Sequence, residues 1–364
     1  MKSGFFHRGI AVAACVVLCL FMARPASAQS GSNIPQEVVG NVIQNIIQNV
    51  RDQIQHRRIV APAGTMRFSG ETSDFDGRDP FASRGVNNPF SALAYAKAPS
   101  LAAPPLSAWL YGANLVGSGD KGSTFGTETS VATVTGAFDV TKIGVFTATD
   151  ALTFIGTGSH SWSHAFTGSL FAPFATDGSI PSTSGTLSYI NGGFSTDFTA
   201  LASWTHNTSN AFGGIPDASA VAYTLNGQYR FDFPYTVWIE PTAGVTYSDA
   251  YTANFGTKLG DSTEVHGGAR AGFETKWMGF TVQPSVSAQA FKIVDTSGVA
   301  PASVNGAYGG RGSGKITVLW TPQFSSYLEV HGTGTTLPKT ALLGAVTSGT
   351  QVVGAQAGLR YTWN

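Results

Sequence analysis

The sequence predicts an all-β fold: an antiparallel, up-and-down transmembrane β-barrel of about twelve strands, preceded by an N-terminal amphipathic helix. Charged residues make up only 12% of the 364 residues, about half the roughly 25% of soluble proteins. Apolar and polar residues alternate from Leu106 to the end, and this period of two is typical of strands with one apolar face. After the first 30 residues, no run approaches the roughly 18 apolar residues that make a membrane-spanning helix.

The charge balance excludes one class of function. The chain has 21 Lys and Arg against 21 Asp and Glu. Nucleic-acid binding through a basic face therefore has no support. With 24 Phe, 11 Tyr and 7 Trp, the chain has too little charge and too many aromatic residues for a soluble surface of its size.

Residues 1–28 have the three-part layout of a secretory signal peptide. Lys2 and Arg8 precede an apolar run, and a small-residue site ends at Ala28. We expect cleavage between Ala28 and Gln29.

The two cysteines lie inside this segment. Cys15 follows Val-Ala-Ala as in a lipoprotein signal, but the apolar run continues well past it, which favours the secretory interpretation. Removal of residues 1–28 removes Cys15, Cys19 and three basic residues, leaving a formal charge of 18 − 21 = −3. A secreted chain without thiols has neither disulfides nor Cys–metal sites.

The segment 29–58 carries the predicted amphipathic helix, from Asn33 to about Arg57. Its apolar residues recur at the helical spacings of three and four: Ile34, Val38, Val39, Val42, Ile43, Ile46, Ile47, Val50 and Ile54. The opposite face is mostly Asn and Gln. Two interpretations stay open: a solvated helix that packs against the protein, and a helix that lies in a polar lumen or pairs with copies of itself.

Residues 59–105 form a Pro/Ala/Gly-rich linker, because six prolines break any long element. Asp74, Asp76 and Asp79 resemble part of a calcium loop. The bidentate Glu at the twelfth position is missing, so a solvated acidic turn is favoured.

Residues 106–364 form the predicted outer-membrane β-barrel. The expected strands are 107–117, 130–141, 151–162, 184–190, 194–205, 219–231, 235–248, 262–276, 279–293, 313–321, 325–333 and 350–363. Long connections (118–129, 163–183, 206–218, 249–261, 294–312 and 334–349) alternate with shorter ones. Short turns at one rim and long loops at the other are typical of outer-membrane barrels.

A soluble β-sandwich would also show this alternation, so the residue types on the two faces must distinguish it from a membrane barrel. The apolar face carries aromatic residues near strand ends, as an interfacial girdle requires: Trp109, Trp204, Tyr229, Phe231, Tyr247, Trp277, Trp320, Tyr361 and Trp363. The polar face carries the residues predicted to face the lumen: Asp139, Asp197, Arg230, Glu240, Glu264, Arg270, Glu274, Lys276, Lys315 and Arg360. Buried charges need partners or water, so these residues either pair across the lumen or line a wet path. Both signs occur, which predicts weak ion selectivity at most.

Other motifs favour structural interpretations. Gly309 to Lys315 nearly matches a phosphate-binding loop, but Ile316 replaces the required Ser or Thr, so we expect a flexible Gly-rich loop. Gly260-Asp261-Ser262-Thr263 resembles a lipase serine block but has no Asp-x-x-His partner nearby.

Histidines and loop aromatics give two further alternatives. His160 and His164 are four residues apart, but the segment is predicted as strand and loop, which disfavours a metal site. Trp162, Phe166, Phe171 and Phe174 could form an adhesive loop surface, although interfacial anchors are the favoured interpretation. We expect no cofactor, no metal site and no enzymatic activity.

Three segments resemble the autotransporter translocator family of Gram-negative bacteria. They are 135–158, the Trp-x-Glu-Pro-x-Ala-Gly-x-x-Tyr segment from Trp238 to Tyr247, and the last strand. In that strand, Leu359, Tyr361 and Trp363 resemble the signal read by the barrel-assembly machinery, although the chain ends in Asn364 instead of an aromatic residue. The resemblance covers about 106–364.

From the resemblance we expect a monomeric barrel in the bacterial outer membrane that contacts lipid, periplasmic chaperones and the barrel-assembly machinery. The resemblance also implies that the N-terminal segment crosses the lumen. Only 77 residues lie between Gln29 and Pro105, without a β-helix repeat or an enzyme-sized domain. We therefore expect a barrel that anchors or translocates its own short N-terminal segment. The alternatives are a passive porin-like channel and a surface-loop adhesin.

Overall fold

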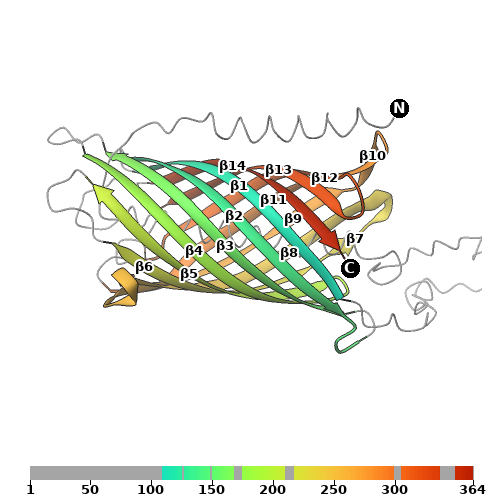
Figure 1. Ribbon diagram of the computed structural model, residues 1–364, viewed down its shortest axis with the longest axis horizontal. Coiled ribbons are helices and arrows are strands. Elements are labelled where there is room, and N and C mark those ends of the chain that lie inside the picture. Colours follow the sequence, from blue (N-terminus) through green and yellow to red (C-terminus); the bar gives the residue numbers. More distant parts are fainter. Residues whose placement is uncertain are drawn as a thin grey trace, which may run out of the picture.

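The structure is a computed structural model, and its described residues all belong to the predicted barrel region (Figure 1). They are 109–124, 127–147, 150–167, 174–209, 217–298, 305–336 and 349–363. The predicted signal peptide and its cleavage site, the helix at 29–58 and the linker at 59–105 lie outside the described residues. Among the described residues, no helix has the length and apolar character needed to cross a membrane.

Fourteen strands and two short 3₁₀ helices make up the described part. The strands are β1 (Trp109–Thr124), β2 (Thr127–Ile143), β3 (Asp150–Thr167), β4 (Phe174–Asn191), β5 (Phe194–Ser209), β6 (Ala218–Tyr229), β7 (Phe231–Asp232), β8 (Val237–Thr252), β9 (Lys258–Phe273), β10 (Thr275–Trp277), β11 (Phe280–Gly298), β12 (Tyr308–Leu319), β13 (Phe324–Thr336) and β14 (Gly349–Trp363). The helices are η1 (Pro234–Thr236) and η2 (Ala253–Phe255). The two-residue β7 continues β6, and the three-residue β10 continues β9. The barrel wall therefore consists of twelve continuous strands, which we call staves.

Each stave pairs antiparallel with the next, and β1 pairs antiparallel with β14 from Tyr111↔Trp363 to Ser123↔Gln351. This last ladder closes the sheet, as Figure 1 shows. The prediction of an antiparallel up-and-down barrel of about twelve strands is confirmed. Closure leaves no open edge, which is the condition for strands to cross hydrocarbon.

The strands are longer than predicted. Most of the segment 118–129, expected to be a loop, is strand, because β1 runs to Thr124 and β2 starts at Thr127. The loop expected at 249–261 is reduced to η2 and its flanking residues, and the Gly-rich segment from Gly309 is the start of β12. The physical reason is that about 9–11 residues cross the bilayer, while backbone pairing continues beyond it without any need for apolar side chains.

Side chains alternate between the outer wall and the lumen. On β14, Val353, Tyr361 and Trp363 are exposed, while Gln356 and Arg360 between them are buried. The outer wall carries many exposed apolar residues, such as Leu115, Phe138, Phe154, Phe198, Tyr223, Leu225, Trp277 and Val353. This is the arrangement of a barrel that faces lipid outside and polar groups inside.

The two rims differ in their connections. The short-turn rim is defined here by the connections 144–149, 192–193, 233–236, 278–279 and 320–323, and the long-loop rim by the connections at the opposite end. Tyr111↔Trp363 pairing places the start of β1 and the end of β14 together at the short-turn rim.

Asp150 stabilises the connection 144–149, the longest of the short-turn rim, through hydrogen bonds to its backbone. Its Oδ1 accepts the Val145 N–H at 2.8 Å, and its Oδ2 accepts the N–H groups of Phe146 at 2.9 Å and Thr147 at 3.1 Å. The Tyr189 hydroxyl also donates to Oδ2 at 3.3 Å. One buried carboxylate therefore satisfies three backbone donors that the turn would otherwise leave unpaired.

We predict that Asp150→Ala lowers the free energy of unfolding by about 2 kcal/mol or more, because hydrogen bonds to a charged group contribute about 1.5–3 kcal/mol. Asp150→Asn keeps one acceptor oxygen and should cost less. Urea titration of the purified barrel in detergent measures both values. Equal stability of Asp150→Ala and the parent protein would contradict this role of the turn.

Candidate functional site: the barrel lumen

The lumen wall has two chemically different halves. On β2 to β5 it carries mainly small hydroxyl side chains, which are buried and pair across neighbouring strands. The pairs are Thr133–Ser161 (2.8 Å), Thr141–Thr153 (2.9 Å), Thr157–Ser184 (2.6 Å), Ser159–Ser182 (2.5 Å) and Thr186–Thr199 (2.8 Å). Because both partners of each pair are hydroxyls, this half is polar but carries little charge.

The other half, from β6 through β14, carries most of the lumen charges. Among the predicted lumen residues of this half, Glu240 and Arg360 are buried, and Arg230, Glu264, Arg270, Glu274 and Lys315 are half-buried. Two further predicted residues, Asp139 on β2 and Asp197 on β5, are buried in the first half. Lys276 lies exposed on β10 at the short-turn rim, apart from this group. The prediction omitted Asp120, Trp238, His266, Arg311, Glu329 and His331, which also lie on the lumen side of the wall.

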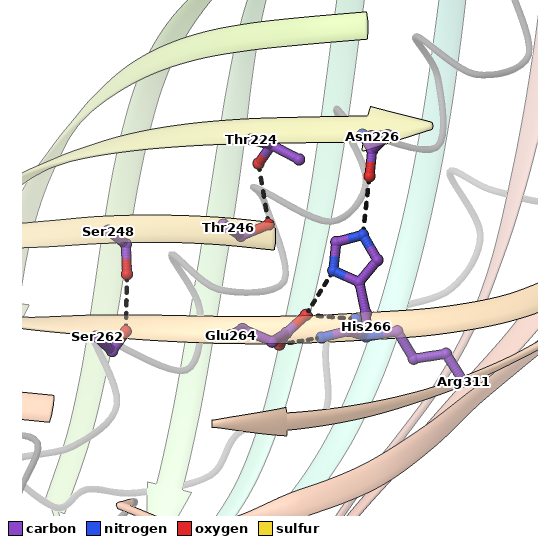
Figure 2. A network of polar contacts seen from close by, with 8 residues as sticks. All are labelled: Thr224, Asn226, Thr246, Ser248, Ser262, Glu264, His266 and Arg311. Carbon is purple, nitrogen blue, oxygen red and sulfur yellow. Dashed lines mark hydrogen bonds and ion pairs between the residues drawn. The ribbon is translucent and has the colours of Figure 1, made fainter. Parts of the chain in front are cut away.

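A chain of contacts connects β12, β9 and β6 of this half (Figure 2) and continues to β5 of the other half. Arg311 on β12 donates to both carboxylate oxygens of Glu264 on β9, at 2.8 and 2.7 Å. His266 Nδ1 lies 3.4 Å from Glu264, and its Nε2 donates to Asn226 Oδ1 on β6 at 2.8 Å. Asn226 in turn donates to Asp197 on β5 at 2.9 Å. A two-point Arg–carboxylate contact fixes orientation as well as charge.

Two of the lumen contacts reach over an intervening strand at a glycine, which makes room for them. Gly244 of β8 lies in register between Asn226 and His266. A Cβ at Gly244 would lie 2.6 Å from His266 Nε2. Gly354 of β14 lies in the same way between Asp120 and His331, whose side chains meet at 2.6 Å.

Two contacts of this kind cross the seam where β1 meets β14. The Asp120–His331 pair connects β1 to β13 over β14. Arg360 of β14 donates to Asp139 of β2 at 2.8 Å, over β1. Both are contacts between residues far apart in sequence, so they reinforce the backbone ladder that closes the barrel.

Ion pairs near the short-turn rim complete the charged half. Arg270 donates to Glu240 at 3.1 Å, and Arg230 donates to Asp232 at 2.7 Å and lies 3.8 Å from Glu274. The Arg230 guanidinium also lies over the ring of buried Trp238, 5.0 Å from its centroid.

Two motifs from the sequence, the Gly-rich segment that starts at Gly309 and the serine block that starts at Gly260, both lie within strands. Gly309 to Lys315 belong to β12, which corrects the expected flexible loop; Arg311 there is held by Glu264. Ser262, from the segment that resembles a lipase serine block, lies on β9. Its hydroxyl is hydrogen-bonded to the Ser248 hydroxyl on β8 at 2.8 Å (Figure 2).

Histidine–aspartate pairs line the outer wall near the long-loop rim. His160 and His164 both lie on β3; His164 pairs with Asp177, and His160 Nε2 lies 3.2 Å from Ser179 Oγ. Among the described residues, no group of three or more His, Cys, Asp or Glu side chains is placed to hold a metal ion.

Asp217, just before β6, belongs to a second such pair. Its hydrogen bonds from His206 and from the Asn207 N–H lower the pKa of this carboxyl below its usual range. The pair therefore persists as the pH falls through the ordinary aspartate range, and it is lost only below that.

Aromatic residues mark the rims of the outer wall. Trp363 stacks with Tyr361 at 5.9 Å and with Tyr111 at 6.1 Å between ring centroids. Leu359 lies on the same face of β14. Trp162 and Phe166 on β3 are exposed, and Phe171 lies outside the described residues.

Known structures with the same fold exist, although no protein-family model matches the chain and no curated protein matches its sequence. The β domain of the Bordetella autotransporter BrkA superposes with a TM-score of 0.51 at 15% identity, covering 69% of this chain and 98% of that one. The fold is that of an autotransporter translocator domain. The transport unit of the autotransporter AIDA-I from Escherichia coli gives a TM-score of 0.48 at 13% identity, covering 74% of this chain and 95% of that one.

We predict that the absence of a side chain at Gly354 stabilises the barrel. Gly354→Ala places a methyl group against Asp120 and His331 and should lower the free energy of unfolding by about 2 kcal/mol, because buried polar groups lose their partner. The matched control is Gly334→Ala on β13, where a Cβ meets nothing within 4 Å. The temperature at which each variant unfolds is measured by its heat-dependent shift in mobility on a gel. Equal unfolding temperatures of the two variants would contradict the prediction.

We also predict strong coupling between Glu264 and Arg311. Glu264→Gln and Arg311→Met should each cost about 3 kcal/mol, since each leaves a buried partner uncompensated. The double variant should cost much less than the sum. Arg270→Met combined with Glu264→Gln should be additive, because the two residues lie about 20 Å apart along β9. Additivity in the Glu264–Arg311 cycle would show that the pair is not coupled.

Proposed function

We propose that this protein is an autotransporter-like barrel of the bacterial outer membrane that anchors or translocates its own short N-terminal segment. The observation that carries the proposal is the position of the start of β1. Because Tyr111 pairs with Trp363, the chain before Trp109 joins the barrel at the short-turn rim, where β14 ends.

The lumen supports a route through the barrel. A chain that starts at the short-turn rim can reach the other rim only through the lumen, since backbone without hydrogen-bond partners is excluded from hydrocarbon. Hydroxyl pairs on β2 to β5 and ion pairs on β6 to β14 give that route a polar wall.

The proposal includes no enzymatic activity. Ser179 and His160 are 3.2 Å apart on the outer wall. Among the described residues, His160 has no carboxylate partner to orient it, as a nucleophile–base pair requires. The backbone amides near Ser179 belong to the β3–β4 and β4–β5 ladders, where they are unsuited to stabilise an oxyanion. We further propose lipid, periplasmic chaperones and the assembly machinery as the partners of a monomeric barrel.

Protease digestion of intact cells tests export. One tag follows Gln29 and a second lies in the connection 168–173 at the long-loop rim; a control tag lies between Gly192 and Gly193 at the short-turn rim. We expect cleavage of the first two tags on intact cells, and of the control only after permeabilisation. Cleavage of the 168–173 tag alone would reject export while keeping the barrel.

A passive channel is the second candidate, favoured by the charged lumen wall. Single-channel recording of the full chain and of a variant lacking residues 29–58 separates the two functions. We expect conductance to rise on deletion. A stable open conductance that the deletion leaves unchanged would support the channel instead.

A further inference from the structure

The charged half of the lumen contains a cavity of about 70 Å³. At roughly 10–15 Å³ per water molecule, this volume holds about five to seven water-sized groups. We propose that this cavity binds a small neutral solute that carries several hydroxyl groups, a polyol. This site goes beyond the proposed function and does not depend on it.

Three neighbouring rows of side chains form the described wall of the cavity, the third of which contains Glu329 and Gln356. In the first row, Gln228, Thr242, Gln289 and Arg311 follow one another across β6, β8, β11 and β12, with Gly268 of β9 between Thr242 and Gln289. At Gly268 the backbone of β11 comes close, because a Cβ there would clash with the Ala288 carbonyl oxygen and Gln289 Cα. The second row lies one step nearer the short-turn rim and begins with Glu240 and Arg270.

The first row contains buried polar atoms without partners. Both amide atoms of Gln228 lack a hydrogen-bond partner, and the side chain is only 4% exposed. Thr242 Oγ1 and Gln289 Nε2 lack partners as well. Each such buried group costs about 1–3 kcal/mol if nothing binds it. A ligand in the cavity would remove that cost.

The unpaired atoms specify the chemistry of the ligand. They are uncharged, and they include amide donors, an amide acceptor and a hydroxyl that does both. Hydroxyl groups of a solute can donate and accept, so one polyol can satisfy all of them. An ion or an apolar ligand would leave donors or acceptors unmatched.

The charged groups of the wall are already paired. Arg270 binds Glu240, Arg311 binds Glu264, and His331 binds Asp120. Glu329 accepts a hydrogen bond from Gln356 at 3.0 Å. Because Arg270, Arg311 and His331 each bind a carboxylate, the wall attracts a free anion only weakly, which favours a neutral ligand over an anion.

Binding of glycerol, a polyol of six non-hydrogen atoms that fits this volume, to the purified full chain tests the proposal, with saturation-transfer NMR as the readout. We expect saturable binding by the parent protein and a loss of affinity of tenfold or more in Gln228→Leu/Gln289→Leu. Leu is close to Gln in size, and removing unpaired polar groups should leave the melting temperature unchanged or raise it. The matched control, Gln351→Leu on the exposed face of β14, should bind like the parent.

Thr242→Val is a second, smaller change at the same wall and should also weaken binding. The proposal is overturned if the parent shows no saturable glycerol binding, which would mean a cavity for water only. It is equally overturned if the Gln variants bind glycerol as well as the parent does, or if potassium chloride or a short peptide displaces glycerol from the parent. None of these outcomes affects the tag-cleavage test of export.

Discussion

A sheet that crosses hydrocarbon must pair every backbone N–H and C=O within itself, and in this protein the β1–β14 ladder completes that pairing. Without this ladder, two strands of 16 and 15 residues would present open edges. Closure also creates an inside and an outside, so the alternating side chains acquire opposite roles. It further places both ends of the barrel chain at the short-turn rim, which is the geometric basis of the proposed function.

The lumen shows how a closed sheet is reinforced from within. On β2 to β5, hydroxyl pairs join immediate neighbours, because short side chains reach no further. On the opposite half, longer side chains reach over a whole strand where a glycine such as Gly244 or Gly354 leaves a gap. At the seam, Asp120–His331 and Asp139–Arg360 both cross a terminal strand. Glycine in a strand costs local stability, and at these two positions the contact above it accounts for its presence.

The face of most residues was predictable, because the period of two is a local property. Arg360 and Glu240 were placed on the polar face and are buried; Tyr361 and Trp363 were placed on the apolar face and are exposed. The strand ends were not predictable in the same way. Asp120 and Arg311 fell in expected loops because their neighbours are Gly, Ser and Lys, which mark turns in water. Beyond the bilayer, however, strands keep pairing whatever their side chains, so these residues belong to the lumen wall.

The sequence by itself determined the class of fold, the inner and outer faces and the low charge of the lipid-facing wall, because alternation is written into successive residues. Only the tertiary structure decided which inner residues meet. Arg360 and Asp139 are 221 residues apart, and His331 and Asp120 are 211 apart. Alternation fixes a face but carries no information on register or on which strand closes the barrel. The contacts over Gly354 and the unpaired amide of Gln228 follow from register alone, so they became visible only once the staves were aligned.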